Sequence, residues 1–477
     1  MVTREPRSRL RAVNSEFGAV ATAGSGAARP SAAVIGGGPG GLMAAEVLAR
    51  AGASVTVYEH MPSMGRKFLI AGRGGLNITH SEPLEQFMTR YGDKQDALAQ
   101  SVSAFPPEAI QAWCEGLSQK SFVGSSGRVF PLGFRATELL RSWLVDLETL
   151  GVSLQTSRRW LGWDQATGAL LVAADEKNSD LIPPQQLFPD ITIMSLGGGS
   201  WQRTGSDGRW VPRFEEIGIN VHKLRPANSG FLVDWTAEFI TKFEGMPVKN
   251  VSVQARGNPV LGETVPGETV LGEIDLGEID LGETDLGETV PGETVRGEMM
   301  ISAEGIEGGC VYAVGRELRA ACDAQGNTVM LIDLRPDLSV EQVEQRLSTA
   351  KPKESSSRLL RRTIGLPPVA IGLLREVTKN VLPRQASDLA VLIKSLPLQV
   401  LATEELDRAI STAGGVAFEE LDDRFMLRRL PGVFVAGEMI DWEAPTGGYL
   451  LQATLSTAVA AAKGALSWWE QEHPTEM

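Results

Sequence analysis

The apolar positions near the start of the chain predict a strand, a helix and a second strand in close succession. Ala32–Ile35 is an uninterrupted apolar run, as expected of a parallel strand that is covered on both faces. An Ala- and Leu-rich segment that ends at Gly52 predicts a helix, and Val55–Glu59 predicts the second strand. This order favours an α/β fold built on a parallel sheet.

The pattern along the rest of the chain changes twice. Helices are predicted at 84–91, 107–118 and 136–150, and strands at 153–156, 170–174 and 191–196. From about residue 211 short strands prevail, at 220–224, 231–234, 248–254 and 299–303, followed by a helix at 309–323 and a strand at 329–334. Several helices between 339 and 393 then precede a strand at 396–401, a buried strand at 432–436 and a long Ala-rich helix that begins at 446–448.

These changes divide the chain into domains. One domain is expected to take residues 31–210 and 412–469, and a β-rich domain to take residues 211–335 and a return strand at 396–411. A helical insertion is expected at 336–395. Residues 1–30 are expected to be a disordered extension, although their arginines among Ser, Ala and Gly also suit an organelle-targeting segment.

A five-residue repeat at 262–298 accounts for most of the net charge of −14. It holds eight Glu, three Asp and one Arg, so its charge is 1 − 11 = −10 and the remaining residues carry only −14 + 10 = −4. We expect a solvated, largely disordered loop here, with a five-residue β-solenoid as the alternative. The near-neutral remainder argues against a nucleic acid as an obligatory partner.

Other composition features narrow the class of protein. The three cysteines are far apart and form no C-x-x-C motif, and the four histidines are scattered, so no metal site is predicted. Cysteine usage suits a reducing, cytoplasmic setting. No apolar stretch approaches the twenty residues of a membrane span, and no membrane partner is expected.

The turn after the first strand carries a dinucleotide-binding pattern. Gly36, Gly38 and Gly41 fit G-x-G-x-x-G, with Pro39 inside the turn and Glu59 at the end of the second strand. The glycines allow a tight turn, backbone approach to a pyrophosphate and close helix–strand packing, and the acid suits the adenosine ribose hydroxyls. The alternative is a glycine-rich turn in an ordinary βαβ unit.

A second glycine-rich segment, 64–80, contains Arg66, Lys67, Gly74, Gly75 and Asn77. It is predicted to be a loop that wraps an anionic or planar ligand with backbone N–H groups, rather than a mobile surface loop. Asn77 suits either a contact to a polar ring edge or the cap of a turn.

A third group of residues comes from the last part of the chain. Gly437 and Glu438 follow a buried strand, where an open α/β sheet binds ligands. Gly447, Gly448 and Tyr449 begin the long helix, whose free N–H groups suit the N1–C2=O edge of a reduced flavin. In a separate turn at 204–208, Asp207 is as suited to forming the turn as to binding a ligand.

Six blocks of this sequence together resemble the BaiN/RdsA-type, or aminoacetone oxidase family, FAD-binding flavoproteins. The blocks are 34–59, 65–80, 127–131, 196–208, 412–416 and 436–452, and the resemblance spans about residues 31 to 468 apart from the repeat. It implies an α/β fold with a two-dinucleotide-binding-type, Rossmann-like FAD domain. A β-barrel-like domain that carries a helical insertion would interrupt it.

The resemblance also implies roles for the residues above. The first glycines would hold the FAD pyrophosphate and Glu59 the ribose. The group from Arg66 to Asn77 would line the flavin, and the group from Gly437 to Tyr449 would close on the ribityl chain and ring. Reduction of enone-containing steroid acids is among the activities proposed in the wider family.

The sequence therefore predicts an FAD-dependent oxidoreductase. It would transfer hydride through flavin N5 to or from an unidentified small organic substrate. NAD(P)H is the expected second cofactor, although no second complete G-x-G-x-x-G is present. A flavin monooxygenase, a non-catalytic flavin redox sensor and a tRNA-modifying flavoprotein are the alternatives. No catalytic residue and no oligomeric state are assigned.

Overall fold

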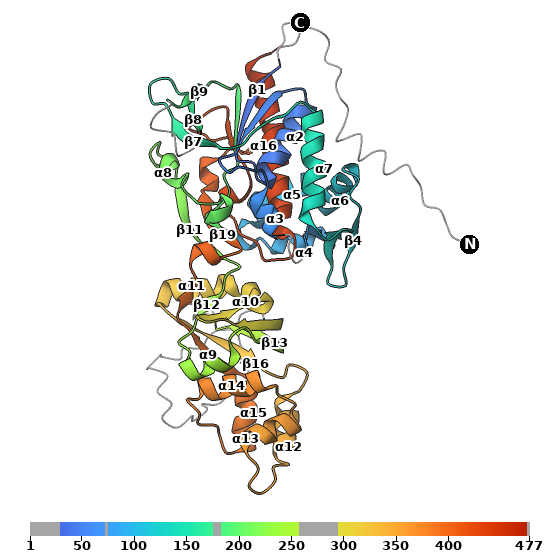
Figure 1. Ribbon diagram of the computed structural model, residues 1–477, viewed down its shortest axis with the longest axis vertical. Coiled ribbons are helices and arrows are strands. Elements are labelled where there is room, and N and C mark those ends of the chain that lie inside the picture. The colour runs from blue at the N-terminus through green and yellow to red at the C-terminus, as the bar shows by residue number, and fades with distance from the viewer. Residues whose placement is uncertain (1–28, 72–74, 175–182, 257–293, 475–477) are drawn as a thin grey trace, which may run out of the picture. The chain divides into compact units, whose positions relative to one another are not determined.

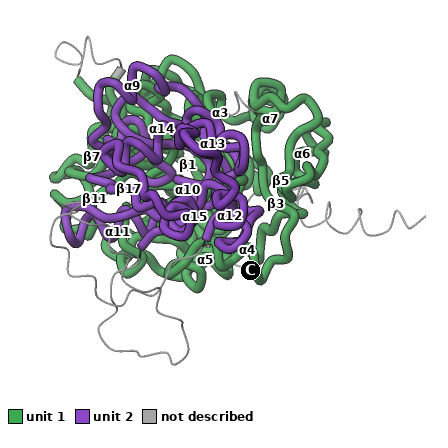
Figure 2. Tube along the Cα trace, turned by 90° about the horizontal axis from the view of Figure 1, so that it is seen from below, with its two compact units in different colours: residues 1–226, 410–477 green, residues 227–409 purple. Residues whose placement is uncertain are grey.

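The computed structural model describes residues 29–71, 75–174, 183–256 and 294–474. The chain forms two compact units, one of residues 1–226 and 410–477 and one of residues 227–409 (Figure 2). Each unit has its own hydrophobic core. Almost all of the expected extension at 1–30, and the repeat up to residue 293, lie outside the described residues.

A five-stranded parallel sheet forms the centre of the first unit. Its strand order is β20-β10-β1-β2-β6, and every pair is parallel. The strands are β1 (Ser31–Ile35), β2 (Ser54–Tyr58), β6 (Ser153–Gln155), β10 (Ile191–Met194) and β20 (Val433–Val435). The chain continues from β1 to β2 on one side, and β10 lies on the other side, so the strand order reverses at β1. Ligands of open α/β sheets bind at this point, beyond the carboxyl ends of the strands.

Long helices pack together beside this sheet (Figure 1). α2 (Pro39–Arg50) connects β1 to β2 and packs along α16 (Tyr449–Glu472), which also contacts α5 (Gln95–Ala104). α2 begins at Pro39, whose fixed φ suits the first helical position, and the chain leaves the helix through Gly52 at φ +93°. The helices predicted at 107–118 and 136–150 are confirmed as α6 (Pro107–Gly116) and α7 (Ala136–Thr149).

A buried carboxylate joins three of these helices. Glu46 of α2 is 2% exposed and accepts hydrogen bonds from Trp113 Nε1 of α6 at 3.1 Å and Trp143 Nε1 of α7 at 2.7 Å. Arg50, one turn along α2, forms an ion pair with it at 2.9 Å. Because a buried charge is costly unless it is paired, these donors are what allow Glu46 to lie in the core.

Shorter elements complete the first unit. β3 (Thr79–His80), β5 (Arg128–Pro131) and β4 (Ser121–Val123) form one antiparallel sheet, and β7 (Arg158–Trp163), β8 (Leu170–Ala174) and β9 (Gln185–Leu187) form another. β11 (Val221–Ala227) pairs with β19 (Ser411–Val416). The short helices are α3 (Arg66–Ala71), α4 (Leu84–Thr89) and α8 (Val211–Glu215).

The prediction of a loop throughout 64–80 was wrong at its start. Residues 66–71 form the helix α3, which buries Phe68. This segment contains no glycine, whereas the glycines that suggested a loop stand before it, at 65, and after it, at 72, 74 and 75. Gly74 lies outside the described residues.

A seven-stranded antiparallel sheet dominates the second unit. Its order is β17-β16-β13-β14-β15-β12-β18. The strands are β12 (Phe231–Leu232), β13 (Pro247–Ala255), β14 (Val295–Ile301), β15 (Gly305–Glu307), β16 (Thr328–Asp333), β17 (Leu396–Val400) and β18 (Ala402–Thr403). The helices are α9 (Ala237–Phe243), α10 (Gly309–Ala313), α11 (Gly315–Gln325), α12 (Val340–Leu347), α13 (Ser356–Thr363), α14 (Pro368–Val377) and α15 (Ala386–Lys394).

Two details of this unit differ from the sequence expectations. The second unit begins at residue 227 rather than 211, because Trp210, Phe214 and Ile219 belong to the hydrophobic core of the first unit. The last residues of the repeat are not a loop, since β14 starts at Val295 and pairs Gly297 with Val251 of β13. Among the described residues, no helix has the length and apolar character that crossing a bilayer requires.

Candidate dinucleotide-binding site

In the G-x-G-x-x-G pattern of the turn after β1, a side chain at the first and last glycine would clash with backbone, whereas the position at the middle glycine is open. A Cβ at Gly36, which has φ +111°, would lie 2.1 Å from the carbonyl oxygen of Ser195. A Cβ at Gly41 would lie 1.9 Å from the carbonyl oxygen of Gly36. No described atom lies within 4 Å of the corresponding position at Gly38, which precedes Pro39 at the start of α2. No side chain caps the first turn of α2, so its free N–H groups are available to a ligand.

Glu59 lies beneath the same turn. Its Oε2 accepts a hydrogen bond from the backbone N–H of Gly37 at 2.8 Å, and its Oε1 accepts one from Met61 at 2.7 Å. The side chain is therefore fixed in place at the end of β2. Because each carboxylate oxygen can accept two hydrogen bonds, Glu59 retains acceptor capacity for ribose hydroxyls.

A cavity of about 150 Å³ opens beside Gly36. A cavity of about this size is large enough for a small aromatic ring. It is rich in arginine and aromatic side chains and lies within the first unit. Its lining comprises Ile35, Gly36, Tyr58, His60, Arg158, Arg159, Trp160, Leu161, Leu196, Gly205, Asp207, Arg209, Trp210 and Arg213.

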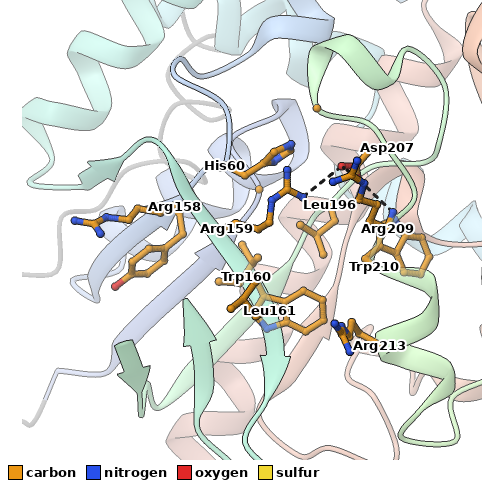
Figure 3. Close-up of a pocket in the computed structure, with 14 residues that line it drawn as sticks. His60, Arg158, Arg159, Trp160, Leu161, Leu196, Asp207, Arg209, Trp210 and Arg213 are labelled. Atoms are coloured by element: carbon orange, nitrogen blue, oxygen red, sulfur yellow. Dashed lines mark hydrogen bonds and ion pairs between the residues drawn. The ribbon is translucent and has the colours of Figure 1, made fainter. Parts of the chain in front are cut away.

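Asp207 organises one wall of this cavity (Figure 3). Its Oδ1 accepts a hydrogen bond from the backbone N–H of Arg209 at 3.2 Å, which stabilises the turn. Its Oδ2 lies 3.4 Å from Arg159 Nη1 and 3.6 Å from Arg209 Nε. Asp207 thus forms the turn and holds two arginine side chains at the cavity, while its role as a ligand-binding residue stays a prediction.

The two tryptophans of the cavity differ in their hydrogen bonds. Trp210 Nε1 donates to the carbonyl oxygen of Gly197 at 2.9 Å. Trp160 is 8% exposed, and its Nε1 has no partner among the described residues. A buried N–H group without an acceptor is unfavourable, so this position suits a ligand that brings an acceptor.

A second part of the site joins residues that are far apart in sequence. Lys67 Nζ of α3 lies 2.7 Å from Glu438 Oε2 and 2.8 Å from Ser200 Oγ. Glu438 is 7% exposed, and its Oε1 accepts a hydrogen bond from the backbone N–H of Thr412 at 3.0 Å. Lys67 and Glu438, which the sequence analysis treated separately, therefore form one ion pair.

Gly437 connects this ion pair to the glycine-rich turn. Its Cα lies 3.7 Å from the position that a Cβ of Gly40 would occupy, and its N–H donates to Thr457 Oγ1 of α16 at 3.0 Å. The start of α2, the end of β20 and the face of α16 thus meet at one place. Glycines at these positions allow the three backbones to approach closely.

The start of α16 is equally constrained. Gly447 and Gly448 have φ values of +127° and +104°, and a Cβ at Gly448 would lie 2.6 Å from the backbone of Thr79. The first turn carries neither an acidic residue nor a side-chain cap. The positive end of this 24-residue helix therefore lies against β3 without a compensating charge of its own.

The side chain of Tyr449, the first residue of α16, is held by contacts with three residues of the first unit. Its ring packs against His80 and Phe87 at centroid distances of 5.4 and 4.8 Å, and its hydroxyl donates to Glu82 Oε1 at 2.6 Å. Burial, together with the neighbouring Glu82, raises the pKa of Tyr449 well above its ordinary value. Its hydroxyl is thus engaged with Glu82, while its ring also lies at the helix start, with Cε2 3.1 Å from the position that a Cβ of Gly447 would occupy.

Two of the remaining predicted residues, Arg66 and Asn77, each have a buried polar atom without a hydrogen-bond partner among the described residues. Arg66 Nε and Asn77 Oδ1 are buried and have no partner among the described residues, although Arg66 Nη1 lies 3.4 Å from Ser63 Oγ. Gly75 has φ +118° and lies against aromatic rings of Phe130 and Phe134. An unpartnered donor and an unpartnered acceptor are what a polar ligand edge would satisfy.

A charged cluster that the sequence analysis did not identify surrounds Asp441, three residues after Glu438. Asp441 Oδ2 lies 2.7 Å from His222 Nδ1 and 2.9 Å from Lys94 Nζ. Burial lowers the pKa of Lys94, but the hydrogen bond and charge of Asp441 outweigh it and raise that pKa above the ordinary value. This cluster fixes the loop between β20 and α16. No group of three or more His, Cys, Asp or Glu in the described ranges is arranged to hold a metal ion.

Comparison with known proteins gives a family match over most of the chain. The model of the HI0933-like protein Rossmann domain matches residues 30–464. A 3-dehydro-bile acid delta(4,6)-reductase of Clostridium scindens is 25% identical over 447 residues, which are 91% of this chain and 98% of that protein.

Two further proteins are more distant. A ribosomal RNA dihydrouridine synthase of Haemophilus influenzae is 22% identical over 450 residues, 90% of this chain and 96% of that protein. The 3-ketosteroid delta1-dehydrogenase structure from Sterolibacterium denitrificans is 13% identical, with a TM-score of 0.45, and covers 92% of this chain and all of that one.

Proposed function

The chain belongs to the HI0933-like Rossmann-domain family of flavoprotein oxidoreductases, and from this premise we propose that it binds FAD and transfers hydride between the flavin and a small organic substrate. The observation that carries the proposal is the open space over Gly38. Gly36 and Gly41 are required by packing within the protein, but nothing in the described structure occupies the position of a Gly38 side chain. A pyrophosphate bound at the N-terminus of α2 would explain the glycine, because a side chain at position 38 would keep the pyrophosphate away from the backbone.

The cavity beside Gly36 supports FAD rather than FMN as the cofactor. It is lined by Tyr58 and His60, the residues on either side of Glu59, which would bind the adenosine ribose, and it is large enough to take part of an aromatic base. Trp160 Nε1 would donate to a ring nitrogen of the adenine, and the arginine side chains held by Asp207 would cover its faces.

The groups around Glu438 fit the flavin half. Lys67 and Glu438 would bind the ribityl hydroxyls, and the orphaned Asn77 Oδ1 would accept a hydrogen bond from the flavin ring. When bound, FAD supplies two-electron hydride chemistry at its N5 atom. The protein's own residues would then position the ring, exclude water from it and stabilise charge at its edges.

The names of the two relatives support a substrate class. One relative is a reductase of a 3-dehydro-bile acid, and the other makes dihydrouridine in ribosomal RNA. Both activities correspond to saturation of a carbon–carbon double bond conjugated with a carbonyl group. We therefore propose a conjugated double bond as the hydride acceptor and NADH or NADPH as the donor. RNA is the second candidate substrate, because the second relative acts on RNA.

Anaerobic reduction of the FAD-loaded protein tests this function. We expect NADH or NADPH to bleach the flavin bands within seconds, and a conjugated enone probe or a uridine-containing RNA to restore them. Admitting oxygen without substrate then separates a reductase, which reoxidises slowly, from a monooxygenase or oxidase. Flavin bands that persist with both donors and every probe would refute the proposed reaction and favour a non-catalytic sensor.

A further inference from the structure

Arg128 lies beside the N-terminus of α16. It is the first residue of β5, which pairs with His80 of β3, and Gly448 rests on the backbone of Thr79 in that same strand. Arg128 Nε lies 3.6 Å from the position that a Cβ of Gly447 would occupy. The small sheet thus places a guanidinium at the positive end of the longest helix in the described part of the chain.

No carboxylate of the described residues neutralises this charge. Arg128 forms no ion pair with another described residue, and the first turn of α16 contains no acidic residue. Glu82, the carboxylate that contacts Tyr449 of that turn, is already paired with Arg90 at 2.9 Å and accepts the Tyr449 hydroxyl. Two positive contributions therefore coincide, the helix N-terminus and Arg128, without a counter-charge from the part of the chain that the structure describes.

Asn77 Oδ1, before the same small sheet, is a hydrogen-bond acceptor, whereas Arg128 is a donor with a positive charge. Asn77 Oδ1 is a buried acceptor without a donor, and Ile78, the next residue, donates its N–H to the carbonyl oxygen of Val129 in β5. The small sheet therefore presents donors and positive charge, and the segment directly before β3 presents an acceptor. The pyrimidine edge of a flavin has the complementary pattern, with acceptors at N1 and C2=O and a donor at N3.

We propose that Arg128 stabilises the negative charge that reduction places on the N1–C2=O edge of the flavin. The proposal rests on FAD binding at this site, as proposed above, and assigns part of the electrostatic control to one side chain. Fixed positive charge at the position where negative charge develops favours the reduced form. Arg128 therefore raises the flavin reduction potential, and the helix N-terminus acts in the same direction.

The test compares the reduction potential of FAD in the wild-type protein with that in Arg128→Gln and Arg128→Lys. We expect Arg128→Gln to favour the oxidised form about tenfold, which for two electrons lowers the potential by about 30 mV, and Arg128→Lys to stay near wild type. Arg141→Gln removes an exposed charge on α7 and serves as the control for net charge.

Sulfite provides a second readout on the same proteins. Its sulfur lone pair forms a bond to flavin N5, and the displaced electron pair gives a negative charge at N1–C2=O. We expect about a tenfold loss of sulfite affinity in Arg128→Gln and little change in Arg128→Lys. If Arg128→Gln binds FAD poorly, Arg128→Met offers a second neutral side chain of similar length.

Each outcome decides the proposal. An unchanged potential and sulfite affinity in an FAD-loaded neutral variant would overturn the role of Arg128 while leaving FAD binding intact. Equal losses in Arg128→Lys and Arg128→Gln would also overturn it, because shape rather than charge would then matter. If neither neutral variant retains FAD but folds normally by circular dichroism, while Arg128→Lys retains it, the role of the charge is supported. A wild-type protein that binds no FAD would refute both this role and the proposed function.

Discussion

The substitution Gly38→Ala should affect the affinity for FAD without lowering the stability of the apoprotein. Gly38 has φ −80° and ψ 179°, which alanine adopts without strain, and its Cβ would meet no described atom within 4 Å. The substitution should therefore leave the free energy of unfolding of the apoprotein unchanged or raise it by about 0.4–1 kcal/mol, through the entropy of the unfolded chain.

The same methyl group would occupy the space proposed for the pyrophosphate. Displacing it weakens one or two charge-assisted hydrogen bonds from the N-terminus of α2, each of which contributes about 1.5–3 kcal/mol. We therefore expect the Kd for FAD to rise at least about tenfold. Thermal unfolding of the apoprotein and titration with FAD, followed by flavin fluorescence, measure the two effects separately.

Two other glycines provide the controls. Gly116→Ala, at the end of α6, also meets open space and should change neither FAD affinity nor stability by much. Gly41→Ala would place a Cβ 1.9 Å from a carbonyl oxygen and should impair folding itself. A Gly38→Ala protein that binds FAD as tightly as wild type would refute the assignment of this turn to the pyrophosphate.

Four further predictions follow from particular contacts. Glu46→Ala leaves two buried indole N–H groups without their acceptor, so we expect the free energy of unfolding in urea to fall by about 3 kcal/mol, and a loss below 1 kcal/mol would contradict this. Glu438→Ala removes the partner of Lys67 and the proposed ribityl contact, so FAD retention during gel filtration should fall, and unchanged occupancy would disprove that contact. Trp160→Phe keeps the ring but removes its N–H, so FAD affinity should drop several-fold while FMN affinity does not, and equal effects would place the adenine elsewhere. Burial raises the pKa of Glu82, but hydrogen bonds from Arg90 and Tyr449 outweigh it and hold that pKa below its ordinary value. The stabilising contribution of Glu82 is therefore complete above the ordinary Glu pKa of about 4.3 and is lost as the pH falls through the lower folded value; acid unfolding curves of Glu82→Gln should lack this loss.

Local patterns were sufficient for the parts of the fold that depend on neighbouring residues. The sequence from Ala32 to Glu59 predicted β1, α2 and β2, because apolar runs, an Ala- and Leu-rich segment and a closing glycine all act within a few residues. The expected α/β fold with a Rossmann-like domain is confirmed by the parallel sheet and the family match.

Contacts over long sequence distances could not be predicted in this way. Lys67 and Glu438 are 371 positions apart, and nothing in either segment indicates that they form an ion pair. The cavity beside Gly36 combines β7 with the turn around Asp207, which lie in different parts of the chain. A glutamate inside the apolar helix α2 was visible in the sequence, but its two tryptophan partners come from other helices.

The sequence pattern also could not predict the direction in which a side chain points. The role of Tyr449 near the flavin stays a prediction, whereas its hydrogen bond to Glu82 and the burial of its ring could not be predicted from the sequence. The rotation of α16 about its axis sets this direction, and that rotation depends on how the helix packs against α2 and α5.

The central claim is most directly tested by the flavin content of the purified protein. We predict that protein incubated with FAD and then separated from free cofactor retains one equivalent of FAD per chain, with flavin absorption bands, and retains FMN far less well. A folded protein that holds no flavin after this treatment would contradict the account, because the glycine-rich turn, Glu59 and the cavity would then have no dinucleotide to bind.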